Sequence, residues 1–123
     1  MLNGSVATKI HLAPGATDMR LGMDGLSALA RSRLGLDPLS GHLILFRNRR
    51  GDRLKILVWD RNGFVLYYKR LSQGRFRLPR IAAGAERVEM DATTLAMLLD
   101  GIDVELVARP TRWTPPSTLT ART

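Results

Sequence analysis

The chain has 123 residues, of which 19 are lysine or arginine and 11 are aspartate or glutamate, so its formal net charge at pH 7 is +8. This length suits one domain with a real core and is too short for a catalytic domain joined to a separate binding domain. The sequence contains no cysteine, which excludes disulfides, thiolate catalysis and cysteine-ligated zinc or iron–sulfur sites.

The first regular elements that the sequence predicts are a short strand and a helix. Residues 9–13 are typical of a strand, and Pro-Gly-Ala at residues 14–16 is expected to break it into a turn. Thr-Asp at residues 17–18 can then cap a helix over about residues 20–34, which Gly35 is expected to end. The buried stripe of this helix consists of Leu26, Leu29, Ala30 and Leu34.

A β-meander is predicted for the centre of the chain. Turn-forming residues at 37–41 precede three strand-like runs, at residues 42–47, 53–60 and 64–70, which are separated by short polar turns. Asn-Gly at residues 62–63 is a strong hairpin signal, because both residues tolerate a positive φ. The runs therefore pair as consecutive antiparallel strands.

The middle run of the meander predicts two different faces, since side chains alternate along a strand. The first face is a core face made of Leu54, Ile56 and Val58. The second is a basic face with an aromatic, made of Arg53, Lys55, Leu57 and Trp59.

The remaining elements complete a single α+β domain over residues 1–105. Residues 75–78 alternate basic and apolar side chains and are a candidate fourth strand. A second helix is expected at residues 91–100, with Asp91 as its N-cap and a glycine stop directly after it. We expect a small antiparallel β-meander of three to five strands packed with two helices, followed by an extended, mobile, basic tail at residues 106–123.

The positive charge is concentrated in one segment. Residues 47–80 carry eleven basic and two acidic residues, whereas residues 81–105 carry one basic and six acidic residues. Such clustering is the electrostatic footprint of a polyanion binder, and the alternative is a solvated turn whose charges maintain solubility. We predict that the basic hairpin binds nucleic acid. The candidate residues are Arg47, Arg49, Arg50, Arg53, Lys55, Lys69, Arg70, Arg75 and Arg77.

Aromatic residues are interleaved with these charges. On small sheets most aromatics belong to the core or to cross-strand pairs, and we favour this role over the stacking of unpaired bases. The four residues are Trp59, Tyr67, Tyr68 and Phe76.

The sequence lacks the usual signs of an enzyme. His11 and His42 are isolated, and no phosphate-binding glycine motif is present. A metal-dependent nuclease would need a carboxylate cluster, for which Asp18, Asp24 and Asp60 are the candidates, but capping and turn positions account for them better. We therefore expect a non-catalytic protein with no cofactor, no metal and no small-molecule substrate.

The expected location is the bacterial cytoplasm. No stretch approaches the roughly 20 apolar residues of a membrane span. Residues 1–8 lack the basic start and the apolar core of a signal peptide. We expect no contact with a membrane.

Several phrases of the sequence occur together in a specific order and spacing. They are Thr17-Asp18-Met19-Arg20, Met23-Asp24-Gly25-Leu26, residues 46–53 (Phe-Arg-Asn-Arg-Arg-Gly-Asp-Arg), Trp59-Asp60, Tyr68-Lys69-Arg70-Leu71 and residues 95–103 (Leu-Ala-Met-Leu-Leu-Asp-Gly-Ile-Asp). Over about residues 9–103 the sequence resembles the TnpB accessory proteins, the second-reading-frame proteins of the sixty-six family of bacterial insertion sequences. The resemblance implies a protein that is encoded beside a separate transposase and a further small accessory protein, and that is needed for efficient transposition.

Two roles follow from these observations. In the first, the protein is an accessory factor whose basic hairpin contacts the phosphates of DNA at the ends of the insertion sequence. In the second, it is an adaptor that binds the transposase or the other accessory protein through the acidic segment at 81–105 or the proline-rich tail, without direct DNA binding.

Overall fold

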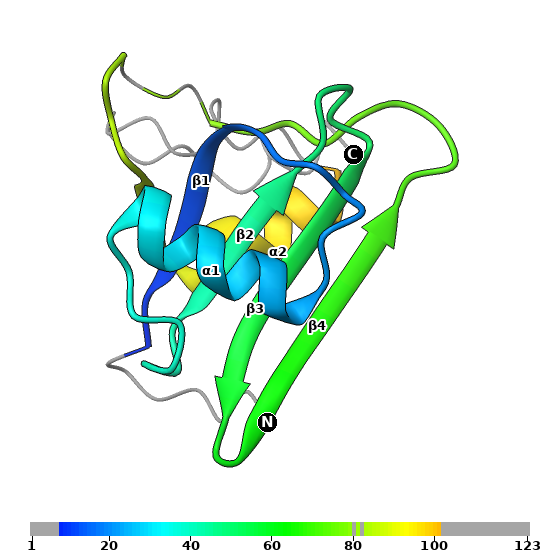
Figure 1. The fold of residues 1–123 in the computed structure, drawn as a ribbon. Helices are drawn as coiled ribbons and strands as arrows, with labels where there is room; N and C mark the ends of the chain where they lie inside the picture. The colour runs from blue at the N-terminus through cyan, green and yellow to red at the C-terminus, as the bar shows by residue number, and fades with distance from the viewer. Residues whose placement is uncertain (1–7, 80, 82, 102–123) are drawn as a thin grey trace.

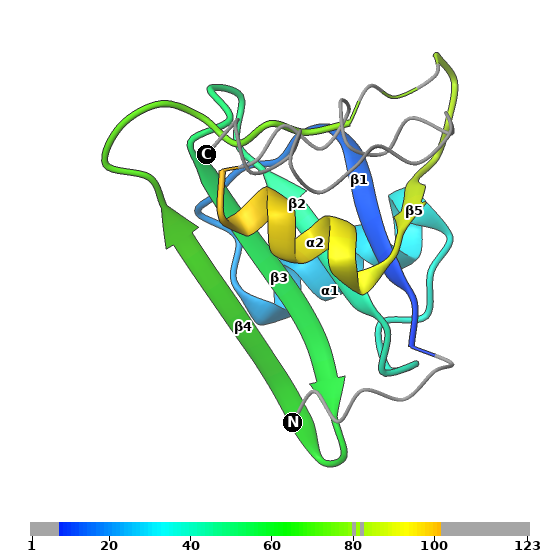
Figure 2. The same ribbon diagram turned by 180° about the vertical axis from the view of Figure 1, so that it is seen from behind.

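The structure, a computed structural model, describes residues 8–79, 81 and 83–101, and these form one sheet with a helix on each face (Figures 1 and 2). Five strands are arranged in the order β4-β3-β2-β1-β5. The elements in chain order are β1 (Ile10–Ala16), α1 (Met23–Leu34), β2 (Leu43–Arg47), β3 (Arg53–Asp60), β4 (Gly63–Arg70), β5 (Val88–Met90) and α2 (Ala92–Leu99). The predicted α+β fold with two helices is confirmed.

The sheet combines the predicted meander with a parallel pair. Strands β2, β3 and β4 pair antiparallel in sequence order. Strand β1 lies parallel to β2, and the short β5 pairs antiparallel with β1. The connection between two parallel strands must cross one face of the sheet, and α1, which lies between β1 and β2 in the chain, therefore covers that face. Helix α2 covers the other face.

Strand β1 is longer than predicted. The turn expected at residues 14–16 is wrong, because β1 continues through them to Ala16 with an irregularity in its pairing to β2. Pro14 lacks an amide hydrogen and Gly15 has a φ of 76°, so the strand bulges there instead of ending. The amide of Thr17 then donates to the Arg47 carbonyl at 2.7 Å, which extends the contact between the two strands.

Helix α1 begins later than predicted and has no side-chain cap. Its N-cap is Gly22, so the predicted cap at residues 17–18 is wrong. The Asp18 carboxylate instead accepts hydrogen bonds from the backbone amide and the guanidinium of Arg20, which lower the pKa of Asp18 to about 2. The predicted end is confirmed, because Gly35 has a φ of 65° and its amide donates to the Ala30 carbonyl.

The turns and short elements show three further differences. The predicted Asn-Gly turn at residues 62–63 is shifted by one residue: Asp60 pairs with Gly63, so the β3–β4 loop consists of Arg61 and Asn62. Arg61, and not Gly63, has the positive φ, at 61°. Residues 75–78 form no strand, and the Phe76 amide donates instead to the Gly51 carbonyl in the β2–β3 turn. Strand β5 has three residues and was not predicted, since so short a run has no detectable alternation. The N-cap of α2 is confirmed, because Asp91 Oδ1 accepts from the Thr94 amide at 2.7 Å.

The two faces of the sheet carry two cores, and this corrects the prediction for β3. Leu54, Ile56 and Val58 lie in the core beneath α2, as predicted. The opposite face is not an exposed basic face, because α1 covers it: Leu57 is completely buried there, and Lys55 is only 8% exposed. An alternating pattern distinguishes two faces, but it does not reveal which of them a helix covers.

His11 on β1 is a buried titratable group. The residue is 3% exposed, and its Nδ1 atom has no hydrogen-bond partner among the described residues. Burial lowers the pKa of His11; Glu89 across the β1–β5 pair opposes this shift, and Arg87, His42 and Lys9 reinforce it. The folded state therefore resists protonation of this imidazole.

We expect the free energy of unfolding to fall as the pH is lowered from about 7 to about 5, because only the unfolded chain takes up this proton near its ordinary pKa of about 6.5. The stabilisation that comes from keeping His11 neutral in the folded state is complete above this pH and is lost progressively as the pH falls below it. Urea titrations across this range should show a weaker pH dependence in His11→Leu than in the unchanged protein. Equal pH dependence in both proteins would contradict this assignment.

Candidate nucleic-acid interface

Basic side chains from three segments gather at one end of the sheet. The turn between β2 and β3, the end of β4 and the segment that follows β4 all lie there, opposite the β3–β4 loop (Figure 1). The register places Arg53 at the start of β3 directly across from Arg70 at the end of β4. We call this group the basic rim. It consists of Arg47, Arg49, Arg50, Arg53, Arg70 and Arg75.

The turn at residues 48–52 is organised by the side chain of Asn48. Asn48 Oδ1 accepts from the amides of Gly51 at 2.9 Å and Arg53 at 3.0 Å, and Nδ2 donates to Asp52 Oδ1 at 2.6 Å. An asparagine at the start of a turn commonly binds its own backbone in this way. The exposed Arg49 and Arg50 are therefore carried on a rigid turn.

The segment after β4 is tied to the same turn by backbone hydrogen bonds. The Leu71 amide donates to the Asp52 carbonyl at 2.8 Å, and the Phe76 amide donates to the Gly51 carbonyl at 2.7 Å. Phe76 is 3% exposed and anchors the segment in the core beneath α2. Gly51 has a φ of 79°, and a Cβ at this position would contact the Arg75 side chain at 3.6 Å. Arg75 is thus held beside a turn that is distant from it in the sequence.

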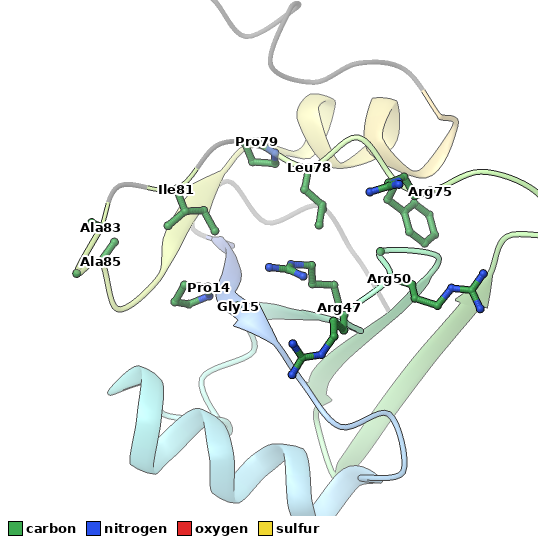
Figure 3. Close-up of a pocket in the computed structure, with 14 residues that line it drawn as sticks. Pro14, Gly15, Arg47, Arg50, Arg75, Leu78, Pro79, Ile81, Ala83 and Ala85 are labelled. Carbon is green, nitrogen blue, oxygen red and sulfur yellow. The ribbon is translucent and has the colours of Figure 1, made fainter.

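A hollow of about 590 Å³ opens between these segments (Figure 3). Four arginines of the basic rim line it, from β2, the turn and the segment after β4. Its other wall is formed by small and apolar residues. The lining residues are Pro14, Gly15, Arg47, Arg49, Arg50, Gly51, Arg75, Phe76, Leu78, Pro79, Ile81, Ala83, Gly84 and Ala85.

The six arginines of the basic rim outnumber the one carboxylate beside them, Asp52, so the rim keeps a net positive charge. The ion pairs found among the described residues are Lys9–Glu89, Arg20–Asp18 and Arg87–Glu86, none of which includes a rim arginine. Arg53 and Arg70 oppose each other across two strands, an arrangement that is unfavourable without an anion.

Asp52 contributes a carboxylate to the turn, and the hydrogen bond from Asn48 is the main cause that lowers its pKa, with Arg50 and Arg53 adding to the shift. This carboxylate therefore stays ionised and holds the turn. An approaching polyanion meets a site that is positive and already formed.

The two lysines of the predicted site are engaged within the fold. Lys55 Nζ donates to the carbonyls of Met19 at 2.7 Å and Leu21 at 2.9 Å, and it lies 4.9 Å from the centroid of the Tyr68 ring. Lys69 Nζ donates to the Leu99 carbonyl at 2.9 Å, at the negative end of the α2 dipole. We therefore place neither lysine in the interface.

The other site residues divide into those the fold brings together and those it does not. Arg77 is exposed but does not line the hollow.

Sequence reasoning missed the organising role of Asn48, although its position at a turn start was a usable signal. It also missed the apolar wall, because Leu78 and Ile81 approach the turn only through tertiary contacts.

Of the four aromatics that the sequence analysis singled out, Phe76 and Trp59 pack within the fold, whereas Tyr67 and Tyr68 are exposed on β4. Trp59 and Phe64 face each other across β3 and β4 with ring centroids 5.1 Å apart in an edge-to-face arrangement. Tyr67 and Tyr68 on β4 are 45% and 49% exposed.

Within residues 8–79, 81 and 83–101, no three histidine, aspartate or glutamate side chains gather in a way that could hold a metal ion. In the same part of the chain, no helix has the length and apolar character to cross a membrane.

Comparison with known proteins gives one family and two close relatives. The model of the family described as IS66 Orf2 like protein matches residues 8–109. The uncharacterized protein y4hO of Sinorhizobium fredii is 39% identical over 103 residues, which cover 84% of this chain and 88% of that protein. The uncharacterized protein y4jC of the same organism is 37% identical over 109 residues, which cover 89% and 92%. No solved structure matches the chain.

Proposed function

The chain belongs to the family of IS66 Orf2-like proteins, and on this premise we propose that it is a non-catalytic accessory protein of transposition that binds DNA through the basic rim. In this role it acts in the cytoplasm beside the transposase and the other accessory protein of its insertion sequence. The observation that carries the proposal is the convergence of arginines from three segments on one rigid, preformed surface.

The chemistry of the basic rim suits a phosphate backbone. Arginine presents a planar fork of donors that matches phosphate oxygens, and the exposed Arg49, Arg50 and Arg75 have no carboxylate partner among the ion pairs of the described residues. Because phosphate contacts carry no sequence information by themselves, the rim accounts for affinity and position on the DNA.

A salt titration tests the proposal. Neutralising about four to six phosphates should make log affinity fall with log salt with a slope of roughly −4 to −5 on duplex DNA. Fluorescence anisotropy with a duplex from the element's ends and with a random duplex would give both the slope and the specificity ratio. Absence of binding at low salt, or a slope near zero, would contradict DNA binding.

The adaptor role is the competing proposal, and copurification separates the two. If the protein remains bound to the transposase after nuclease treatment of the extract, direct protein contact is supported. If nuclease treatment releases it, the DNA is the shared partner.

Asn48→Ala should weaken DNA binding although it removes no charge. The change removes three hydrogen bonds that hold the arginine turn, and we expect about 1–2 kcal/mol of lost stability and about a 3- to 10-fold loss of affinity. The salt slope should stay nearly constant, because the phosphate-binding charges remain. Asn62→Ala, in the loop at the opposite end of the sheet, is the matched control and should leave affinity unchanged.

A further inference from the structure

The hollow beside the β2–β3 turn has two chemically different walls. One wall carries the guanidinium groups of Arg47, Arg49, Arg50 and Arg75. The other is apolar and includes Leu78 and Ile81, both half-buried against the core beneath α2 (Figure 3). A nucleotide joins the same two chemistries, an anionic phosphate and a flat base with apolar faces.

The shape of the hollow distinguishes unpaired from paired DNA. Its volume of about 590 Å³ lies within the range of about 300–1,000 Å³ that is usual for sites of small organic ligands. A duplex keeps the flat faces of its bases stacked inside the helix and exposes phosphates, sugars and base edges, so it contacts the basic rim and offers no base face to the apolar wall. An unpaired strand can place a phosphate against the arginines and its base against the apolar wall.

The arginines suit this ligand better than the aromatic residues do. Guanidinium planes stack on unpaired bases as well as binding phosphate. Arg47 Nη1 donates to the Asn48 carbonyl at 3.2 Å, which fixes its guanidinium at the edge of the turn. Phe76 is 3% exposed, so it supports the wall from the core and offers no face for stacking.

We propose that the hollow binds an unpaired nucleotide of a single-stranded DNA segment, with its phosphate on the arginines and its base against the wall formed by Leu78 and Ile81. This inference rests on the proposed DNA-binding function. The protein would then recognise DNA in which a frayed or single-stranded end adjoins a duplex. The hollow would bind the unpaired end, and the remainder of the basic rim would hold the duplex.

Three DNA ligands test the proposal by anisotropy with the full chain. They are a blunt duplex, the same duplex with a short single-stranded overhang, and that duplex with an abasic overhang of equal phosphate number. We expect the overhang to bind about tenfold more tightly than the blunt duplex, and the abasic overhang to lose most of this gain, because base stacking is removed while the charge is kept.

A wall variant provides a second readout. Ile81→Ser should abolish the preference for the overhang while keeping the affinity for the blunt duplex, which also shows that the variant is folded. Leu39→Ser, at a leucine that is 49% exposed and outside the hollow, is the matched control and should change neither affinity.

Each alternative outcome has a separate meaning. Equal affinity for all three ligands with a steep salt slope would overturn the nucleotide site and leave the proposed DNA binding intact. Equal gains from the normal and the abasic overhang would also overturn it, since phosphates alone would then explain the gain. No binding to any ligand at low salt would refute the proposed function itself.

Discussion

Replacing Arg49, Arg50 and Arg75 together by alanine is expected to lower the affinity for duplex DNA about 100-fold at low salt. These three exposed side chains lie at one site although Arg75 comes from a different segment. Each removed phosphate contact should also reduce the salt slope by about 0.9, so the triple variant should lose roughly 3 from the slope. Anisotropy titrations at several salt concentrations measure both quantities.

A control with the same change in net charge separates the site from general basicity. Arg31, Arg33 and Arg61 are exposed arginines on α1 and in the β3–β4 loop, away from the basic rim. Their triple alanine variant should keep most of the affinity and nearly all of the slope. Equal losses in the two triple variants would show that only net charge matters and would remove the rim as a site.

Lys55→Met is expected to lower the free energy of unfolding by about 2–3 kcal/mol without changing the DNA salt slope. The ammonium group joins β3 to the loop before α1, through the carbonyls of Met19 and Leu21. Its loss leaves two carbonyls without their charged donor in a partly buried position. Methionine keeps most of the aliphatic stem, so the change reports mainly on the hydrogen bonds. Urea unfolding gives the stability, and anisotropy gives the slope.

Lys9→Met is the matched control for this lysine. The Lys9 side chain is 58% exposed, and its ion pair with Glu89 has an N–O distance of 3.8 Å. Exposed pairs of this kind contribute little, so its replacement should change stability by less than about 1 kcal/mol. A stable Lys55→Met variant with a reduced salt slope would instead return Lys55 to the DNA interface.

Sequence reasoning succeeded where the determining forces are local. Asp91 caps α2 because an aspartate accepts a hydrogen bond from an amide three residues later, and Gly35 ends α1 because it adopts a positive φ. It failed at Asp18, where a nearby guanidinium competed for the carboxylate that was expected to cap a helix. The short β5 was missed because it exists only through pairing with β1.

The candidate site shows the same division. Alternation and turn residues identified a basic hairpin, and the arginines on the β2–β3 turn were found from charge density alone. Arg75 was also a candidate because of its charge, but its place beside that turn was not predicted, because hydrogen bonds between the turn and the segment after β4 bring it to the hollow.

By itself, the sequence determined the class of fold, the end of α1 at Gly35, the N-cap of α2 at Asp91, the location of the positive charge and the family resemblance, since these depend on neighbouring residues and their order. The tertiary structure decided which of those charges are available. The parallel pairing of β1 with β2 places α1 over the second face of β3 and buries Lys55, while the turn and the returning segment keep Arg49, Arg50 and Arg75 exposed around one hollow. The physical reason is that burial depends on which elements pack over a side chain, and packing joins residues far apart in the chain.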